Sequence, residues 1–172
     1  MALIAPSTSQ AVTTYTRSAS CAGLDFYPTD SRTEYDNSGT MRVWRSGDTA
    51  NAGSGVFRCD PGLPFGAVVT KVQFTALLEE GYGPGDCALR RSGLNESNAA
   101  TAQDLGRVQF FDGYTTGVVR LTTSSISNAT IDTANWGYWL ECSFNDEFRW
   151  GVTPTDGLYG ADVIYQIPAS KG

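Results

Sequence analysis

The stretch that decides the fold is AVVTKVQFTALL, residues 67–78. One face of this segment collects Val68, Val72, Phe74, Ala76 and Leu78, and the other collects Lys71, Gln73 and Thr75. Successive side chains of a β-strand point to opposite faces, so this alternation predicts a strand with one buried face.

Shorter β-prone segments lie on both sides of it, separated by turns rich in Gly, Pro and Asn. We predict strands at 41–45, 56–59, 67–78, 87–91, 107–111, 117–123, 138–144, 148–152 and 158–167. The rest of 21–55 reads as turns, and 92–106 reads as a polar loop with one helical turn. Short strands at this spacing are typical of an all-β protein, and we predict an antiparallel, jelly-roll-like β-sandwich.

The length of 172 residues predicts a single domain, with residues 21–172 as the sandwich. Residues 1–20 are expected to form an N-terminal arm or an edge strand, because AVTTYTRS (11–18) is β-prone but carries too little apolar surface for a core of its own. The arm should lie along a sheet edge, its own or a neighbouring subunit's, and we favour the neighbour's.

The charge balance argues against nucleic acid as a partner. The net charge is −6, and no basic cluster is longer than Arg90-Arg91. No stretch approaches the roughly 20 apolar residues that cross a bilayer, so membrane insertion is not expected. The first 18 residues also lack the basic start of a secretory signal.

The absence of histidine narrows the chemistry further. It excludes Ser-His-Asp and Cys-His catalysis and every histidine metal ligand. Adjacent carboxylates such as Glu79-Glu80 and Asp146-Glu147 are typical of solvated turns. The oxygen-rich segments 34–40 and 144–148 do not match an EF-hand loop. We therefore predict no enzymatic activity, no metal and no cofactor.

The four cysteines are Cys21, Cys59, Cys87 and Cys142. Their spacing fits no metal-binding pattern, so two disulfides are expected, with four buried free thiols as the alternative. Cys87 shares a face with Leu89, and Cys142 shares one with Leu140. We favour the pairs Cys21–Cys59 and Cys87–Cys142, which join sequential regions without crossing.

The aromatic run NWGYWLECSF, residues 135–144, supplies the candidate contact surface. Alternation directs Tyr138, Leu140, Cys142 and Phe144 inward. Trp139 and Glu141 then point outward. An outward Trp139 has three readings: it stacks on a sugar ring, packs against a neighbouring subunit, or is covered by the chain's own arm or loops. Trp44 and Trp150 are further candidates for the same surface.

Four segments carry a resemblance to a known group of domains. They are PFGAVVTKVQFTA (64–76), CALRRSGL (87–94), VRLTTSSISNATIDTANWGYWLECSF (119–144) and LYGADVIYQI (158–167). Residues 64–167 resemble a poorly characterised group of β-sandwich domains in bacterial exported proteins and phage virion proteins. The resemblance implies a β-sandwich, and the group offers no shared catalytic motif to carry over.

Two functions remain after these exclusions. The favoured one is a non-enzymatic structural protein that assembles outside a virion or cell, as a decoration, fibre or surface-filament subunit. It implies a homo-oligomer or larger assembly at an extracellular or virion surface. The alternative is a secreted carbohydrate-binding β-sandwich module that binds a glycan.

Overall fold

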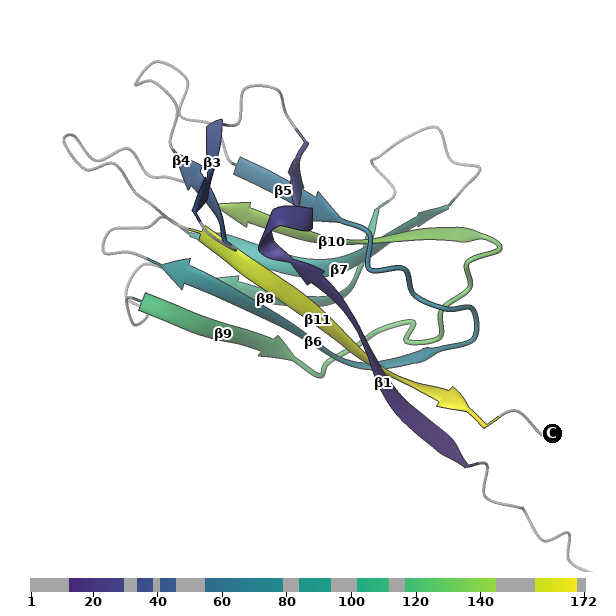
Figure 1. Ribbon diagram of the computed structural model, residues 1–172. Helices are drawn as coiled ribbons and strands as arrows, with labels where there is room; N and C mark the ends of the chain where they lie inside the picture. Colours follow the sequence, from purple (N-terminus) through teal and green to yellow (C-terminus); the bar gives the residue numbers. More distant parts are fainter. Residues whose placement is uncertain are drawn as a thin grey trace, which may run out of the picture.

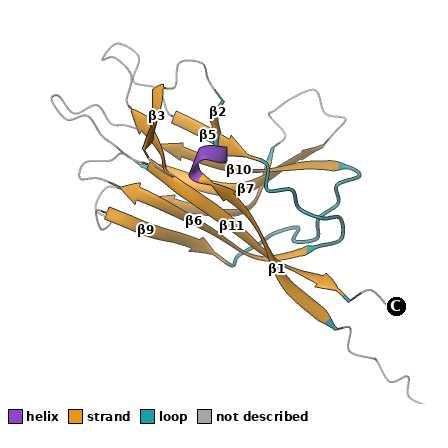
Figure 2. Ribbon diagram, viewed as in Figure 1, coloured by secondary structure: helices purple, strands orange, loops and turns teal. Residues whose placement is uncertain are grey.

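The computed structural model describes residues 13–29, 34–38, 41–45, 55–78, 84–93, 102–111, 117–144 and 157–169. Its strands are β1 (Thr14–Ala22), β2 (Tyr27–Pro28), β3 (Glu34–Ser38), β4 (Met41–Arg45), β5 (Gly55–Cys59), β6 (Val68–Leu78), β7 (Gly85–Gly93), β8 (Gln103–Phe110), β9 (Gly117–Thr123), β10 (Trp136–Phe144) and β11 (Gly157–Pro168). Within these ranges the only helical element is the single 3-10 turn η1 (Gly23–Asp25), drawn in purple in Figure 2. The prediction of an all-β protein is confirmed.

The strands form two antiparallel sheets that lie one behind the other (Figure 1). The six-stranded sheet has the order β3-β4-β11-β6-β9, with β1 also paired to β11. The five-stranded sheet has the order β2-β5-β10-β7-β8. No described helix is long and apolar enough to cross a membrane.

The pairing of the last eight strands is nested. β4 pairs with β11, β5 with β10, β6 with β9 and β7 with β8, each pair antiparallel. Alternate pairs belong to alternate sheets, as in one long hairpin rolled around a core. This is the topology of a jelly roll, and it confirms the predicted fold class.

The core lies between the inward faces of the two sheets. Tyr138, Leu140, Cys142 and Phe144 are buried, as alternation along β10 predicted. Phe57 from β5 meets Phe144 edge to face, with 6.3 Å between ring centroids. The aromatic run is therefore half core wall.

The start of β6 departs from the prediction. Val68 was expected inside, but it is 37% exposed, and Val69 is buried instead. The ladder between β6 and β11 slips by one residue there, since Ile164 pairs with Lys71 and Tyr165 with Val69. This bulge changes which residues face inward, and it cannot be read from the alternation of one strand.

Two predicted loops also contain strands. Residues 34–38 pair with β4, although they read as turns. β8 begins at Gln103 rather than 107, so the polar loop expected at 92–106 is wrong over residues 103–106. Cross-strand pairing overrides weak local propensity at both places. The predicted strand at 148–152 lies outside the described residues.

The N-terminal segment is an edge strand of its own sheet over the part that is described. β1 pairs with β11 from Thr14↔Pro168 to Ala22↔Gly160, and Figure 1 shows the start of β1 and the end of β11 together at one corner. The expected boundary at residue 20 falls inside β1. Pairing within the chain was the less favoured of the two expectations for this arm.

The four cysteines form two disulfides, and the pairing is the one that the sequence favoured. Cys21–Cys59 links β1 in the six-stranded sheet to β5 in the five-stranded sheet. Cys87–Cys142 joins directly opposed residues of the neighbouring strands β7 and β10.

Candidate functional site on the outer face of the five-stranded sheet

One row of side chains crosses all strands of the five-stranded sheet. The cross-strand register aligns Tyr27, Arg58, Glu141, Ala88 and Arg107. Directly opposed residues share a face, and the buried neighbours of Glu141 on β10, Leu140 and Cys142, point inward. The row therefore lies on the outer face.

Glu141 is the centre of this face. Although it points outward, its relative exposure is only 6%. Arg58 Nε and Arg90 Nη1 each lie 2.5 Å from one of its carboxylate oxygens. Trp139 donates its indole Nε1–H to Glu141 Oε2 at 3.0 Å. Three donors thus compensate the desolvation of one carboxylate.

The charged network continues over β7 and β8. Arg90 Nε lies 2.9 Å from Asp104 Oδ1, although without the alignment of a hydrogen bond. Arg107 pairs with Asp86, and its other terminal nitrogen lies 3.7 Å from Asp104 Oδ2. The network joins three arginines to three carboxylates, so its formal charges cancel.

A bulge in β8 explains why Asp104 and Arg107 meet. Residues three apart on a regular strand point to opposite faces. The register jumps from Leu89↔Gly106 to Arg90↔Asp104, which leaves Leu105 buried and without a partner on β7. The extra residue brings both charged side chains to the outer face.

The charged side chains cover the middle of the sheet. Ala88, at the middle of the outer face, is only 1% exposed. Its cross-strand neighbours are Glu141 and Arg107. An alanine methyl group on an outer face is too short to avoid solvent unless longer side chains cover it. The long side chains around Ala88 therefore form a layer over it.

Trp139 stands at one side of this layer and is half-buried. The Arg58 guanidinium carbon lies 5.1 Å from the Trp139 ring centroid, within cation–π range. Tyr27, at the sheet edge in the row of Arg58, is 55% exposed. The face combines a held indole, an exposed phenol and a fixed set of hydrogen-bonding groups.

The predicted site residues are only partly brought together. Trp139 and Glu141 are in contact on β10, as the sequence suggested. The backbone of Trp44 belongs to β4 in the other sheet, and Trp150 lies outside the described residues. Sequence reasoning missed Arg58 and Arg90, because the register that aligns them with Glu141 is not visible in any one strand.

Trp136, at the start of β10, serves a different purpose. It packs against the core, and the Arg91 guanidinium carbon lies 4.1 Å from its ring centroid. The described part of the chain holds no group of three or more His, Cys, Asp or Glu that could bind a metal ion.

Comparisons with known proteins give fold-level likeness only. No family model and no curated protein matches the chain. A family 29 carbohydrate-binding module from Piromyces equi has a TM-score of 0.45 and 11% identity, over 90% of this chain and 91% of that one. The K2 cleaved adhesin domain of Lys-gingipain has a TM-score of 0.42 and 8% identity, over 88% and 99%. The empty head of Turnip Yellow Mosaic Virus has a TM-score of 0.36 and 7% identity, over 98% of this chain and 87% of that one. At these values the likeness says nothing of function.

Proposed function

We propose that this protein is a non-enzymatic, extracellular glycan-binding domain whose binding surface is the outer face of the five-stranded sheet around Trp139. The observation that carries the proposal is the clamp on Trp139. Its indole is partly exposed on a sheet face, and its Nε1–H is held by a buried carboxylate.

A sugar ring needs the two kinds of contact that this face presents. Its C–H face packs on an aromatic ring, and its hydroxyl groups exchange hydrogen bonds at the rim. Trp139 and Tyr27 supply aromatic surface. Arg58, Asp104 and Arg107 are each partly exposed and supply donors and acceptors.

The charged network favours a neutral glycan. Its three arginines and three carboxylates already neutralise one another, so a charged ligand would have to displace a partner. The network also holds its side chains before a ligand arrives. Less conformational entropy is then lost on binding, which raises affinity.

The proposal assigns no catalysis to this face. Glu141, Asp86 and Asp104 are all engaged in ion pairs, and the chain contains no histidine to act as a base near neutral pH. The extracellular setting is supported by the two disulfides, which persist in oxidising compartments.

A glycan array probed with the purified full-length protein tests the binding function. We expect signals on neutral β-linked or α-linked oligosaccharides that survive addition of salt, because the ligand carries no charge to be screened. No signal above background on any neutral glycan, or signals confined to sulfated glycans and abolished by salt, would contradict the proposal.

A second candidate function, homo-oligomeric assembly, is supported by the free edge of β1. Of the nine residues of β1 only Cys21 is buried, and among the described strands β1 pairs with β11 alone. An open edge of this length can accept a strand from a second copy. Light scattering of the full-length protein and of a variant lacking residues 1–16 tests it. Assembly predicts a loss of mass on truncation, whereas an unchanged mass with a lower melting temperature would restrict β1 to its own sheet.

A further inference from the structure

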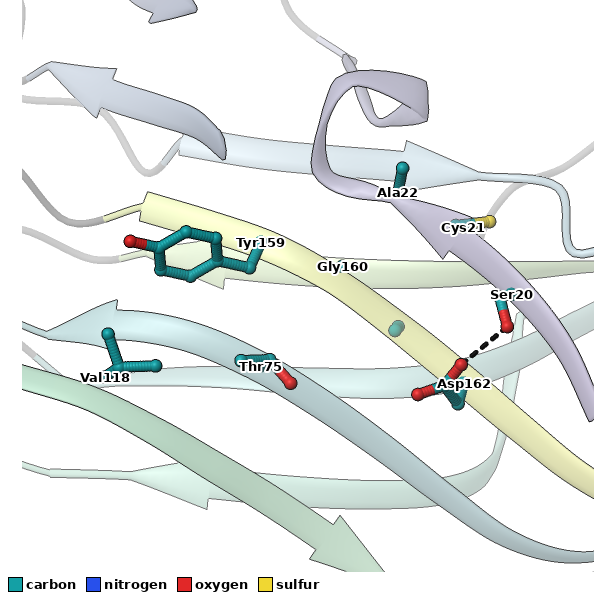
Figure 3. A pocket seen from close by; sticks show the side chains of 9 residues that line it. Ser20, Cys21, Ala22, Thr75, Val118, Tyr159, Gly160 and Asp162 are labelled. Carbon is teal, nitrogen blue, oxygen red and sulfur yellow. Dashed lines mark hydrogen bonds between the residues drawn. The ribbon is translucent and has the colours of Figure 1, made fainter. Parts of the chain in front are cut away.

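A groove of about 450 Å³ lies on the opposite side of the sandwich, on the outer face of the six-stranded sheet. It runs over β1, β11, β6 and β9. Its side chains include Ser20, Thr75, Val118, Tyr159 and Asp162 (Figure 3). The volume falls in the usual range of about 300–1,000 Å³ for small-ligand sites.

A bulge in β11 builds the groove. Leu158 pairs with Ala76 and Gly160 with Thr75, so Tyr159 has no partner on β6. The extra residue allows both Leu158 and Ala161 to be buried while Tyr159 remains 37% exposed on the outer face. Bulges of this kind re-aim a side chain, and they recur beside functional sites.

Gly160 keeps the floor of the groove low. Its φ of +155° is one that L side chains rarely adopt, and a Cβ there would lie 2.6 Å from the Cys21 carbonyl oxygen. Glycine alone permits β1 to approach β11 this closely. The groove therefore depends on two adjacent residues, one bulged and one without a side chain.

The polar groups of the groove make few hydrogen bonds within the described part of the chain. Ser20 Oγ donates to Asp162 Oδ1 at 2.6 Å. Among the described residues, no other side chain donates a hydrogen bond to the Asp162 carboxylate. Figure 3 shows its second carboxylate oxygen turned away from Ser20, toward the side of Thr75. The carboxylate of Asp162 and the hydroxyl of Thr75 thus face the groove. Its other walls are Tyr159 and Val118, and Val118 is 62% exposed.

From this geometry we infer that the groove is a second ligand site, which takes a neutral sugar unit with free vicinal hydroxyl groups. The sugar ring packs against Tyr159 and Val118, and Asp162 accepts hydrogen bonds from its hydroxyls. The choice of a sugar as ligand rests on the proposed function, whereas the site itself does not include Trp139. Sites on opposite faces would let one domain hold two glycan chains, with the gain in avidity that two linked contacts give.

Amide NMR titration of the full-length protein with neutral disaccharides (cellobiose, xylobiose, lactose, maltose and chitobiose) tests the groove. At least one disaccharide should shift the amides of Thr75, Tyr159 and Asp162 in a saturable way. Tyr159→Ala and Asp162→Asn should each weaken that binding about tenfold. Thr16→Ala, which removes a hydroxyl from the outer face of β1 away from the groove, should leave it unchanged.

The outcomes separate this inference from the proposed function. Shifts at the groove that survive Trp139→Ala support a separate site, even if the five-stranded face binds nothing. Shifts confined to residues around Trp139 overturn the second site and leave the first standing. No shift at Thr75, Tyr159 or Asp162 with any disaccharide at millimolar concentration also overturns it. Melting temperatures of both variants confirm that a loss of binding is not a loss of fold, and Asp162→Asn preserves shape if Tyr159→Ala is unstable.

Discussion

Trp139 and Glu141 occupy alternate positions on one face of β10, and the indole Nε1–H of the first is bonded to the carboxylate of the second at 3.0 Å. The same carboxylate holds Arg58 and Arg90 from the strands on either side. One buried acid therefore fixes the aromatic ring and ties three strands together.

Replacing Glu141 should destabilise the domain. Glu141→Ala leaves Arg58 and Arg90 without their shared partner, and a broken buried ion pair costs about 3–5 kcal/mol. Because side-chain exposure is 34% for Arg58 and 22% for Arg90, solvent compensates part of this loss. We expect the free energy of unfolding in urea to fall by about 2–3 kcal/mol.

Asp104→Asn is the matched control, since its carboxylate is 33% exposed and contacts only Arg90 and Arg107 among the described residues. It should cost about 1 kcal/mol or less. If both variants lose equal stability, Glu141 is not the centre of the network.

The cysteine pairs should contribute unequally to local order. Each closes a loop, of 38 residues for Cys21–Cys59 and 55 for Cys87–Cys142, and each should stabilise by roughly 2–4 kcal/mol. Only Cys21–Cys59 anchors the exposed strand β1. Converting that pair to alanine should accelerate amide exchange at Ala19 and Ser20 more than converting Cys87 and Cys142 does. Equal exchange in the two double variants would show that β11 pairing alone holds β1.

Gly160 should tolerate substitution less well than another glycine with positive φ. Gly160→Ala combines an unfavourable φ with a contact against the Cys21 carbonyl, and about 2–3 kcal/mol of stability should be lost. Gly117 has a φ of +111°, but a methyl group added there would meet open space. Gly117→Ala should therefore lose only about 1 kcal/mol of stability. Urea denaturation of both variants measures the difference, and equal losses would mean that β1 shifts to accommodate the methyl group.

Alternation within a strand was readable from the sequence, and so were the faces that it defines. The inward set on β10, the outward placement of Trp139 and Glu141, and the shared face of Cys87 and Leu89 all follow from a period of two. These features depend only on the order of residues within one strand, where apolar residues favour the buried face and polar residues favour the exposed one.

Register between strands was not readable. Val68 turned outward because β6 and β11 slip by one residue, and Asp104 meets Arg107 through a bulge in β8. The contact of Glu141 with Arg58 and Arg90 joins strands far apart in the sequence. Such alignments are set by the packing of the whole sandwich, so no single segment encodes them.

The measurement that tests the central claim most directly is the affinity of Trp139 variants for a glycan that the array identifies, by isothermal titration calorimetry. Trp139→Ala should weaken binding about tenfold or more, because the stacking surface is lost. Trp139→Phe keeps an aromatic face but loses the Nε1–H bond that holds the ring, so its affinity should fall between those of Trp139→Ala and the unaltered protein. If Trp139→Ala binds as tightly as the unaltered protein while remaining folded, the five-stranded face is not the glycan site.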